Sequence, residues 1–110
     1  MFYRGYDEKT LTFTCTEDTH SGDLVTMNDS GTVRPTKLAE EFIGIAVAVR
    51  DGFAAVQLSG YIEVKTVNKI EVGYHYLLAI SNDTVDLAKS STTQRRLVVN
   101  SEAETIGILL

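Results

Sequence analysis

The stretch VQLSGYIEVK, residues 56–65, alternates between apolar or small residues and polar or amphipathic ones. Successive side chains of a β-strand point to opposite faces of the sheet, so this period of two predicts a strand with one buried face and one solvated face. The predicted buried face consists of Val56, Leu58, Gly60, Ile62 and Val64.

The stretches TLTFTCT (10–16) and IGIAVAV (43–49) have the same period. In the first, Leu11, Phe13 and Cys15 alternate with threonines, whose β-branched side chains favour an extended backbone. In the second, Ile and Val alternate with Gly and Ala, so we expect another layer to approach the small face closely.

Turn signals separate these patterns. Asp51-Gly52 lies between two strand patterns and predicts a tight hairpin, because both residues tolerate positive φ. Clusters of Asn, Asp and Ser at 28–31 and 81–83 predict further turns.

One segment has helical spacing. TKLAEEF (36–42) places Leu38 and Phe42 four residues apart, which fits either a helix of one or two turns or a polar loop crossing the end of a barrel. The sequence therefore predicts an all-β fold, a small barrel or sandwich of seven to nine short strands with at most one short helix. We expect a single β-barrel domain at 10–110, preceded by an N-terminal arm at 1–9.

Composition limits the possible functions. The 110 residues are 44% hydrophobic and 23% charged, which is ordinary for a globular chain with one core. A net charge of −5 and a pI of about 4.9 argue against binding to nucleic acid or to an anionic membrane. No apolar segment has signal-peptide or membrane-span length, so we do not expect Sec export. Cys15 is the only cysteine and cannot form an intrachain disulfide, which agrees with a reducing cytoplasm.

Two blocks, 22–49 and 73–110, share an order of features. Each begins at a glycine and continues through an apolar strand, a turn of Asn, Asp and Ser, a Thr-Val pair and a polar connection to Ile-Gly-Ile. The second connection is longer and contains RRLVV (95–99), which predicts an additional strand. The blocks are either structurally related or alike only as β-hairpins are by composition.

Three glycines are expected to be structural. Gly44 and Gly107 are the central residues of the Ile-Gly-Ile segments, and Gly60 lies on the buried face of the alternating stretch. Glycine within a strand often marks a place where neighbouring backbone or a side chain packs closely.

The chemically reactive residues are scattered. His20 and His75 have no Cys or His at metal-ligand spacing, and the segment EDTHSGD (17–23) fits either a surface cation site or a solvated loop. Cys15 lies on the apolar face of a predicted strand, where a thiol is buried and inert. Ser59 lacks the preceding glycine of a nucleophile elbow. We therefore expect no catalytic residue, no metal, no cofactor and no enzymatic activity.

The order GDLVTM, GTVRP, FIGIAVAV, QLSGYIEV, GYHYLL and TIGILL over residues 10–110 resembles the small head decoration (capsid cement) proteins of tailed bacteriophages and prophages. The shared features are glycines and strands, and none is a reactive motif. The resemblance implies a compact β-barrel-like protein, made in the bacterial host cytoplasm, that binds the capsid exterior of the virion. It also implies a homotrimer that holds neighbouring subunits of the major capsid protein together.

In such proteins an N-terminal arm often completes the contact with the shell, and the matching segment here is MFYRGYDEKT (1–10). Either its aromatic and arginine side chains, which are types enriched at interfaces, contact the capsid, or the segment is a frayed terminus. The low proline content and the lack of a long polar tail differ from the lambda-type protein. The candidate contact residues are Phe2, Tyr3, Arg4 and Tyr6.

Two alternative functions remain for such a chain. One is another phage assembly component, such as a head-fibre base or a tail protein, since these use similar β-barrels. The other is a small carbohydrate-binding or ligand-binding module, which would need several exposed aromatic side chains on one sheet face, with Tyr61, Tyr74 and Tyr76 as the candidates.

Overall fold

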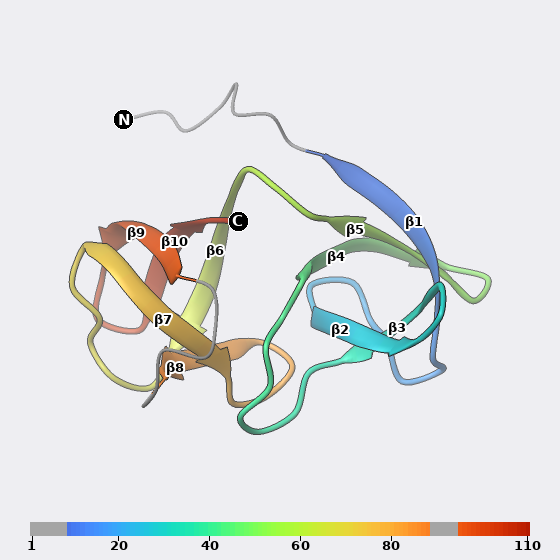
Figure 1. Ribbon diagram of the computed structural model, residues 1–110, viewed down its shortest axis with the longest axis horizontal. Helices are drawn as coiled ribbons and strands as arrows, with labels where there is room; N and C mark the ends of the chain where they lie inside the picture. Colours follow the sequence, from blue (N-terminus) through green and yellow to red (C-terminus); the bar gives the residue numbers. More distant parts are fainter. Residues whose placement is uncertain (1–8, 89–94) are drawn as a thin grey trace.

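The computed structural model describes residues 9–88 and 95–110, and within these ranges the chain forms strands, turns and connections but no helix (Figure 1). The predicted all-β class is confirmed, although the described residues form ten strands and not seven to nine. The strands close into two small five-stranded barrels that lie side by side, where one barrel or a sandwich was expected.

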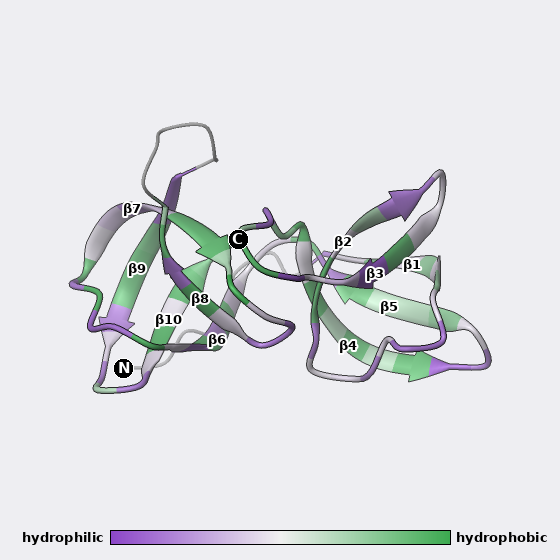
Figure 2. Cartoon of the chain, turned by 90° about the horizontal axis from the view of Figure 1, so that it is seen from below, coloured by the Kyte–Doolittle hydropathy of each residue, from purple (hydrophilic) through white to green (hydrophobic). Residues whose placement is uncertain are grey.

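Each barrel uses five consecutive strands of the chain. Barrel 1 consists of β1 (Thr10–Cys15), β2 (Leu24–Asp29), β3 (Thr32–Pro35), β4 (Gly44–Arg50) and β5 (Phe53–Gln57). Barrel 2 consists of β6 (Tyr61–Thr66), β7 (Gly73–Ala79), β8 (Thr84–Leu87), β9 (Arg95–Ser101) and β10 (Thr105–Leu109). Hydrophobic residues lie along the strands of both barrels, and hydrophilic residues gather mostly in the turns (Figure 2).

The two barrels have the same topology. In each, the first strand pairs in parallel with the third and antiparallel with the fifth. The second strand pairs with the third and fourth, and the fourth pairs with the fifth, all antiparallel. One irregularity is repeated, because β4 and β9 both bulge against the fifth strand of their barrel, at Val47 and Val99. The register shift between β2 and β3 in barrel 1 has no counterpart between β7 and β8. The chain is therefore a tandem structural repeat, in which each barrel is one copy.

Equivalent hydrogen bonds confirm this correspondence between strands. The Thr14 N–H donates to the Gly31 carbonyl at 3.0 Å in barrel 1, as the Lys65 N–H donates to the Asp83 carbonyl at 3.4 Å in barrel 2. Each of these pairs joins the end of the first strand to the turn before the third. The strand pairings thus relate the first strand of each barrel to its third and fifth strands in the same way.

The boundaries of the two structural repeats differ from those of the sequence blocks 22–49 and 73–110. The two Thr-Val pairs are equivalent, since both begin the third strand of a barrel. The Ile-Gly-Ile segments are not, because 43–45 belongs to the start of the fourth strand of barrel 1 and 106–108 to the fifth strand of barrel 2. RRLVV is no addition, because it forms β9, the equivalent of β4. Ile and Gly in a strand reflect burial and close packing. These properties do not determine which strand of the barrel the segment forms.

The alternating stretch 56–65 is interrupted. β5 ends at Gln57 and β6 begins at Tyr61, so the residues between them connect the barrels. Gly60 has a φ of +96°, in the left-handed region that favours glycine. The Gln57 side-chain amide donates to the carbonyl oxygens of Ser59 (3.0 Å) and Tyr61 (3.3 Å) and holds the connection in place. The predicted single strand is therefore wrong at this point.

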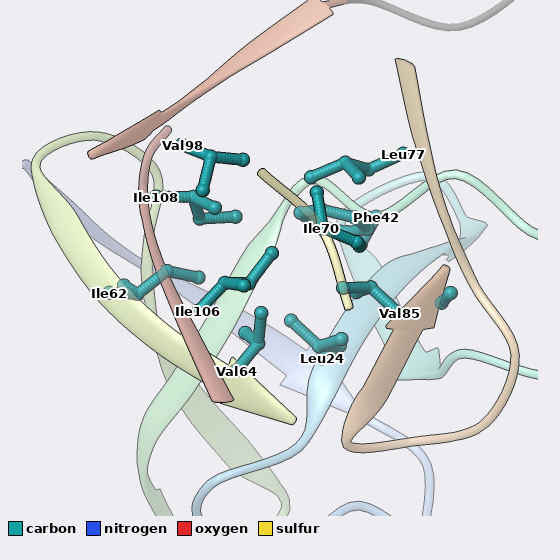
Figure 3. Close-up of a cluster of buried hydrophobic side chains, with 11 residues drawn as sticks. Leu24, Phe42, Ile62, Val64, Ile70, Leu77, Val85, Val98, Ile106 and Ile108 are labelled. Carbon is teal, nitrogen blue, oxygen red and sulfur yellow. The ribbon is translucent and has the colours of Figure 1, made fainter. Parts of the chain in front are cut away.

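The core of barrel 2 includes two residues from the first half of the chain, Leu24 and Phe42. Leu24 has no exposed surface, and Phe42 is also buried. Figure 3 shows both side chains among those of barrel 2, with Leu24 near Val64 and Phe42 beside Ile70. The smaller core of barrel 1 is built around Val25, Val33, Ala46, Ala54 and Val56.

Phe42 reaches barrel 2 because segment 36–42 forms a loop and no helix. Ala39 has a φ of 62°, which is incompatible with a right-handed helix. Glu40 forms an isolated antiparallel bridge with Ala79, which places the loop beside β7. The N···O distance is 3.3 Å from Glu40 N to the Ala79 carbonyl and 2.8 Å from Ala79 N to the Glu40 carbonyl. Of the two structures that the sequence allowed, the loop is the one present.

We predict that Phe42→Ala lowers the free energy of unfolding by about 3–5 kcal/mol, because it removes a buried aromatic ring and leaves a cavity. Leu38→Ala, four residues earlier in the same loop, is the matched control, because Leu38 is 75% exposed. This change should cost less than about 0.5 kcal/mol. Urea unfolding measures both values, and equal effects of the two substitutions would contradict the packing described.

Candidate interaction surface

The segment 17–23, a possible cation site in the sequence, joins the two barrels. Asp23 is buried and accepts hydrogen bonds from the His20 N–H (2.8 Å) and from the Asn82 side-chain amide (2.8 Å). Asp18 accepts a bond from the Thr16 hydroxyl at 2.5 Å, which lowers the pKa of Asp18. Within residues 9–88 and 95–110, no group of three or more His, Cys, Asp or Glu side chains could hold a metal ion.

The remaining reactive side chains have structural contacts. His75 Nε2 lies 2.7 Å from the Glu71 carbonyl oxygen, and Cys15 packs, partly buried, against the core of barrel 1. Both side chains thus have contacts within the fold.

Backbone and hydroxyl groups also connect the barrels. The Leu24 N–H donates to the Asn82 carbonyl at 2.7 Å, and the Thr36 hydroxyl donates to the Ser81 carbonyl at 2.8 Å. Together with Asp23, these bonds fasten barrel 1 to the turn between β7 and β8. The junction is thus hydrogen-bonded at this turn and apolar at Leu24 and Phe42.

A groove of about 460 Å³ lies along the junction. Phe42 and Ile43 line it from the loop, Leu58 from the connection between the barrels, Leu77 from β7 and Leu110 from the end of the sequence. Thr26 and Glu41 also line the groove, which therefore combines apolar side chains with polar and charged ones and is open to solvent.

Arg96 on β9 supplies the positive charge of this groove. One guanidinium nitrogen donates to the Phe42 carbonyl at 3.1 Å, and the guanidinium carbon lies 5.2 Å from the centre of the Phe42 ring. Burial lowers the pKa of Arg96, opposed by the nearby charge of Glu41. An arginine stays protonated in proteins, so the groove carries a partly buried cation beside its apolar and polar side chains.

An ion pair anchors the loop that forms one wall. The Arg34 guanidinium donates to both oxygens of the Glu40 carboxylate, at 2.7 and 2.5 Å, and the Lys37 N–H donates to the same carboxylate at 2.6 Å. The bonds from Arg34, the largest effect, and from Lys37 lower the pKa of Glu40 to about 2, and the pair raises the pKa of Arg34.

The candidate contact residues of the N-terminal arm, Phe2, Tyr3, Arg4 and Tyr6, lie outside the described residues. The first described residue, Lys9, accepts a hydrogen bond from the Leu58 N–H at 2.7 Å and donates its N–H to the Ser59 hydroxyl at 3.1 Å. The chain therefore enters barrel 1 beside the connection between the barrels. Because Leu58 also lines the groove, the described start of the chain adjoins it.

Two of the three glycines named from the sequence lie where a side chain would collide. A Cβ at Gly44 would overlap the Gln57 carbonyl oxygen and approach Val56 Cγ1 to 3.1 Å, and a Cβ at Gly107 would overlap the Tyr61 ring. The Tyr61 ring thus covers the backbone of the neighbouring strand at Gly107. These glycines contribute to closing the barrels and not to a binding site.

Sequence reasoning named Asp23 only as part of the possible cation site in segment 17–23, and it did not select Phe42 or Arg96 as residues of a site. Phe42 and Arg96 come from opposite halves of the chain, so their contact depends on how the barrels dock.

Neither the comparison with protein-family models nor that with curated proteins yields a match to this chain. In the part of the chain that the structure describes, no helix is long and apolar enough to cross a membrane.

We predict that the Arg34–Glu40 pair stabilises the fold at neutral pH but not near pH 2. A carboxylate with a lowered pKa contributes fully above its unfolded value, 4.5, and loses that contribution as pH falls through about 2. Glu40→Gln should therefore lower the free energy of unfolding by about 1–3 kcal/mol at pH 7. Urea unfolding at both pH values measures the difference, and a Glu40→Gln effect that persists near pH 2 would argue against the ion pair as its cause.

Proposed function

We propose that this chain is a non-enzymatic structural protein of a tailed-phage virion, which binds the outside of the capsid and stabilises it as a decoration protein. Its partners are the major capsid protein and, in a homotrimer, further copies of itself. The observation that carries the proposal is the resemblance of the glycine and strand order over residues 10–110 to those proteins.

The architecture supports a function in binding. Closed barrels leave no free sheet edge, so a partner is recognised through side chains, loops and grooves and not by strand addition. The described surface exposes several large apolar side chains, and where such side chains are contiguous they mark a contact surface. They are Leu11, Met27, Leu38, Val47, Phe53, Val67, Val72, Tyr74 and Leu87.

The junction groove is the part of this surface that we assign to the capsid. Its lining brings an aromatic ring, Phe42, and a partly buried arginine, Arg96, together, and both are residue types found at interface hot spots. The N-terminal arm begins beside it, at the bonds between Lys9 and the connection. In this proposal the arm and the groove form one contact region, and three copies in a trimer multiply its modest affinity.

The test is binding to expanded shells assembled from the cognate major capsid protein, measured by co-sedimentation. We expect the unmodified protein to bind, and the double substitution Phe2→Ser/Tyr3→Ser to weaken binding at least about tenfold through lost aromatic contacts. Val67→Ser is the control, because it also removes an apolar side chain, 61% exposed and outside the groove.

A folded protein that fails to bind such shells would refute the proposal. Electron microscopy of labelled particles separates it from the other assembly functions, because a label on the tail or on fibres in place of the capsid faces would contradict decoration.

A further inference from the structure

Two arginines of the described chain are half-buried, and only one of them has a carboxylate partner. Within residues 9–88 and 95–110 they are Arg34 and Arg96. The Arg34 guanidinium donates to both oxygens of the Glu40 carboxylate, which raises the pKa of Arg34. Arg96 is in none of the ion pairs of these residues, and burial lowers its pKa. Arg96 is therefore a cation that has lost part of its hydration without gaining a counter-charge.

The contacts of Arg96 within the fold use little of its hydrogen-bonding capacity. One guanidinium nitrogen donates to the Phe42 carbonyl, and the Phe42 ring lies beside the guanidinium. A guanidinium carries five N–H donors in a planar fork that matches the two oxygens of a carboxylate. Among the described residues, the Phe42 carbonyl is the one acceptor of a hydrogen bond from this side chain, so donors remain for a ligand in the groove.

Glu41, the other charged residue that lines the groove, does not supply the missing counter-charge. Its charge opposes the lowering of the Arg96 pKa, but no ion pair joins the two side chains. Glu41 is exposed, so its carboxylate is hydrated by solvent. As a like charge at short range it repels a second carboxylate, and its removal should therefore favour an acidic ligand.

The apolar side chains of the groove indicate what such a carboxylate is attached to. Phe42 and Leu77 belong to one buried cluster (Figure 3), and Ile43, Leu58 and Leu110 are half-buried around the same hollow of about 460 Å³. The net charge of −5 disfavours a strongly acidic partner, although this repulsion is screened beyond about 10 Å at physiological salt. The matching ligand is a short apolar segment with a single carboxylate.

We propose that the junction groove binds an apolar segment of the major capsid protein through one Asp or Glu side chain, whose carboxylate accepts hydrogen bonds from Arg96. The occupant follows from charge complementarity, because Arg34 shows the same type of side chain already paired in this way inside the chain. The inference rests on the proposed function and adds the chemistry of the capsid segment. A buried, bidentate pair of this kind makes recognition specific for the acidic residue.

A titration of the full chain with 3-phenylpropionate, followed by ¹H–¹⁵N NMR, tests the groove without a capsid. This probe joins an apolar ring to one carboxylate, and 3-phenylpropanamide is its neutral counterpart. The acid should bind with a dissociation constant on the order of 1–10 mM and shift the Arg96 Nε–Hε resonance. The amide should bind at least about fivefold more weakly, since charge-assisted hydrogen bonds are the stronger ones. Equal affinities, or an unshifted Arg96, would overturn the proposal.

Two substitutions that preserve side-chain size should act in opposite directions. Arg96→Gln removes the cation and should abolish the preference for the acid over the amide. Glu41→Gln removes the competing charge and should tighten acid binding at least about twofold, with no change for the amide. Circular dichroism melting verifies that both variants are folded, and Glu41, which is exposed, decides the matter if Arg96→Gln unfolds. A preference that survives Arg96→Gln, or no gain from Glu41→Gln, would contradict the proposed contact.

Co-sedimentation with expanded shells distinguishes failure of this inference from failure of the proposed function. Arg96→Gln should weaken shell binding at least about tenfold, and Glu41→Gln should not weaken it. If the unmodified protein bound shells and folded Arg96→Gln bound them equally well, the inference would fail and the proposed function would stand. If the unmodified protein bound the acid probe but no shells, the proposed function would fail, and with it the capsid as the source of the carboxylate.

Discussion

The structure depends on the insertion of Leu24 and Phe42 from the first half of the chain into the core of the second barrel. A five-stranded barrel of about 50 residues buries little apolar surface, and small domains of this size are marginal without added contacts. Here the added contacts come from the neighbouring repeat. The loop held by Arg34 and Glu40, the bonds of Asp23 and the stacking of Arg96 on Phe42 all keep these two side chains in place.

Equivalent positions of the two barrels differ in chemistry because their surroundings differ. Gly44 and Arg96 occupy the same place in the fourth strand of each barrel, as the pairings of β2 with β4 and of β7 with β9 define it. In barrel 1 this place lies against the Gln57 carbonyl, where only glycine fits. In barrel 2 it lies beside the inserted Phe42, where an arginine covers the ring. The two barrels therefore differ in chemistry at this position of the fourth strand.

Periodicity predicted the strands well, because alternation reports directly which side chains face a core. It did not predict two barrels, since a period of two does not specify strand partners. The stretch 56–65 illustrates this limit, because its alternation continues across the connection although Val56 and Ile62 belong to different cores. The groove could not be predicted from local patterns for the same reason, because residues of both barrels line it. The proposed arm contacts fall outside the described residues.

The most direct measurement of the central claim is the amide dispersion of residues 59–110 alone in a ¹H–¹⁵N NMR spectrum. Without Leu24 and Phe42 the second barrel lacks part of its core, so the account predicts the narrow dispersion of an unfolded chain, whereas the full chain gives dispersed β-sheet resonances. A dispersed spectrum for the isolated half, with the same barrel-2 shifts as in the full chain, would contradict the account.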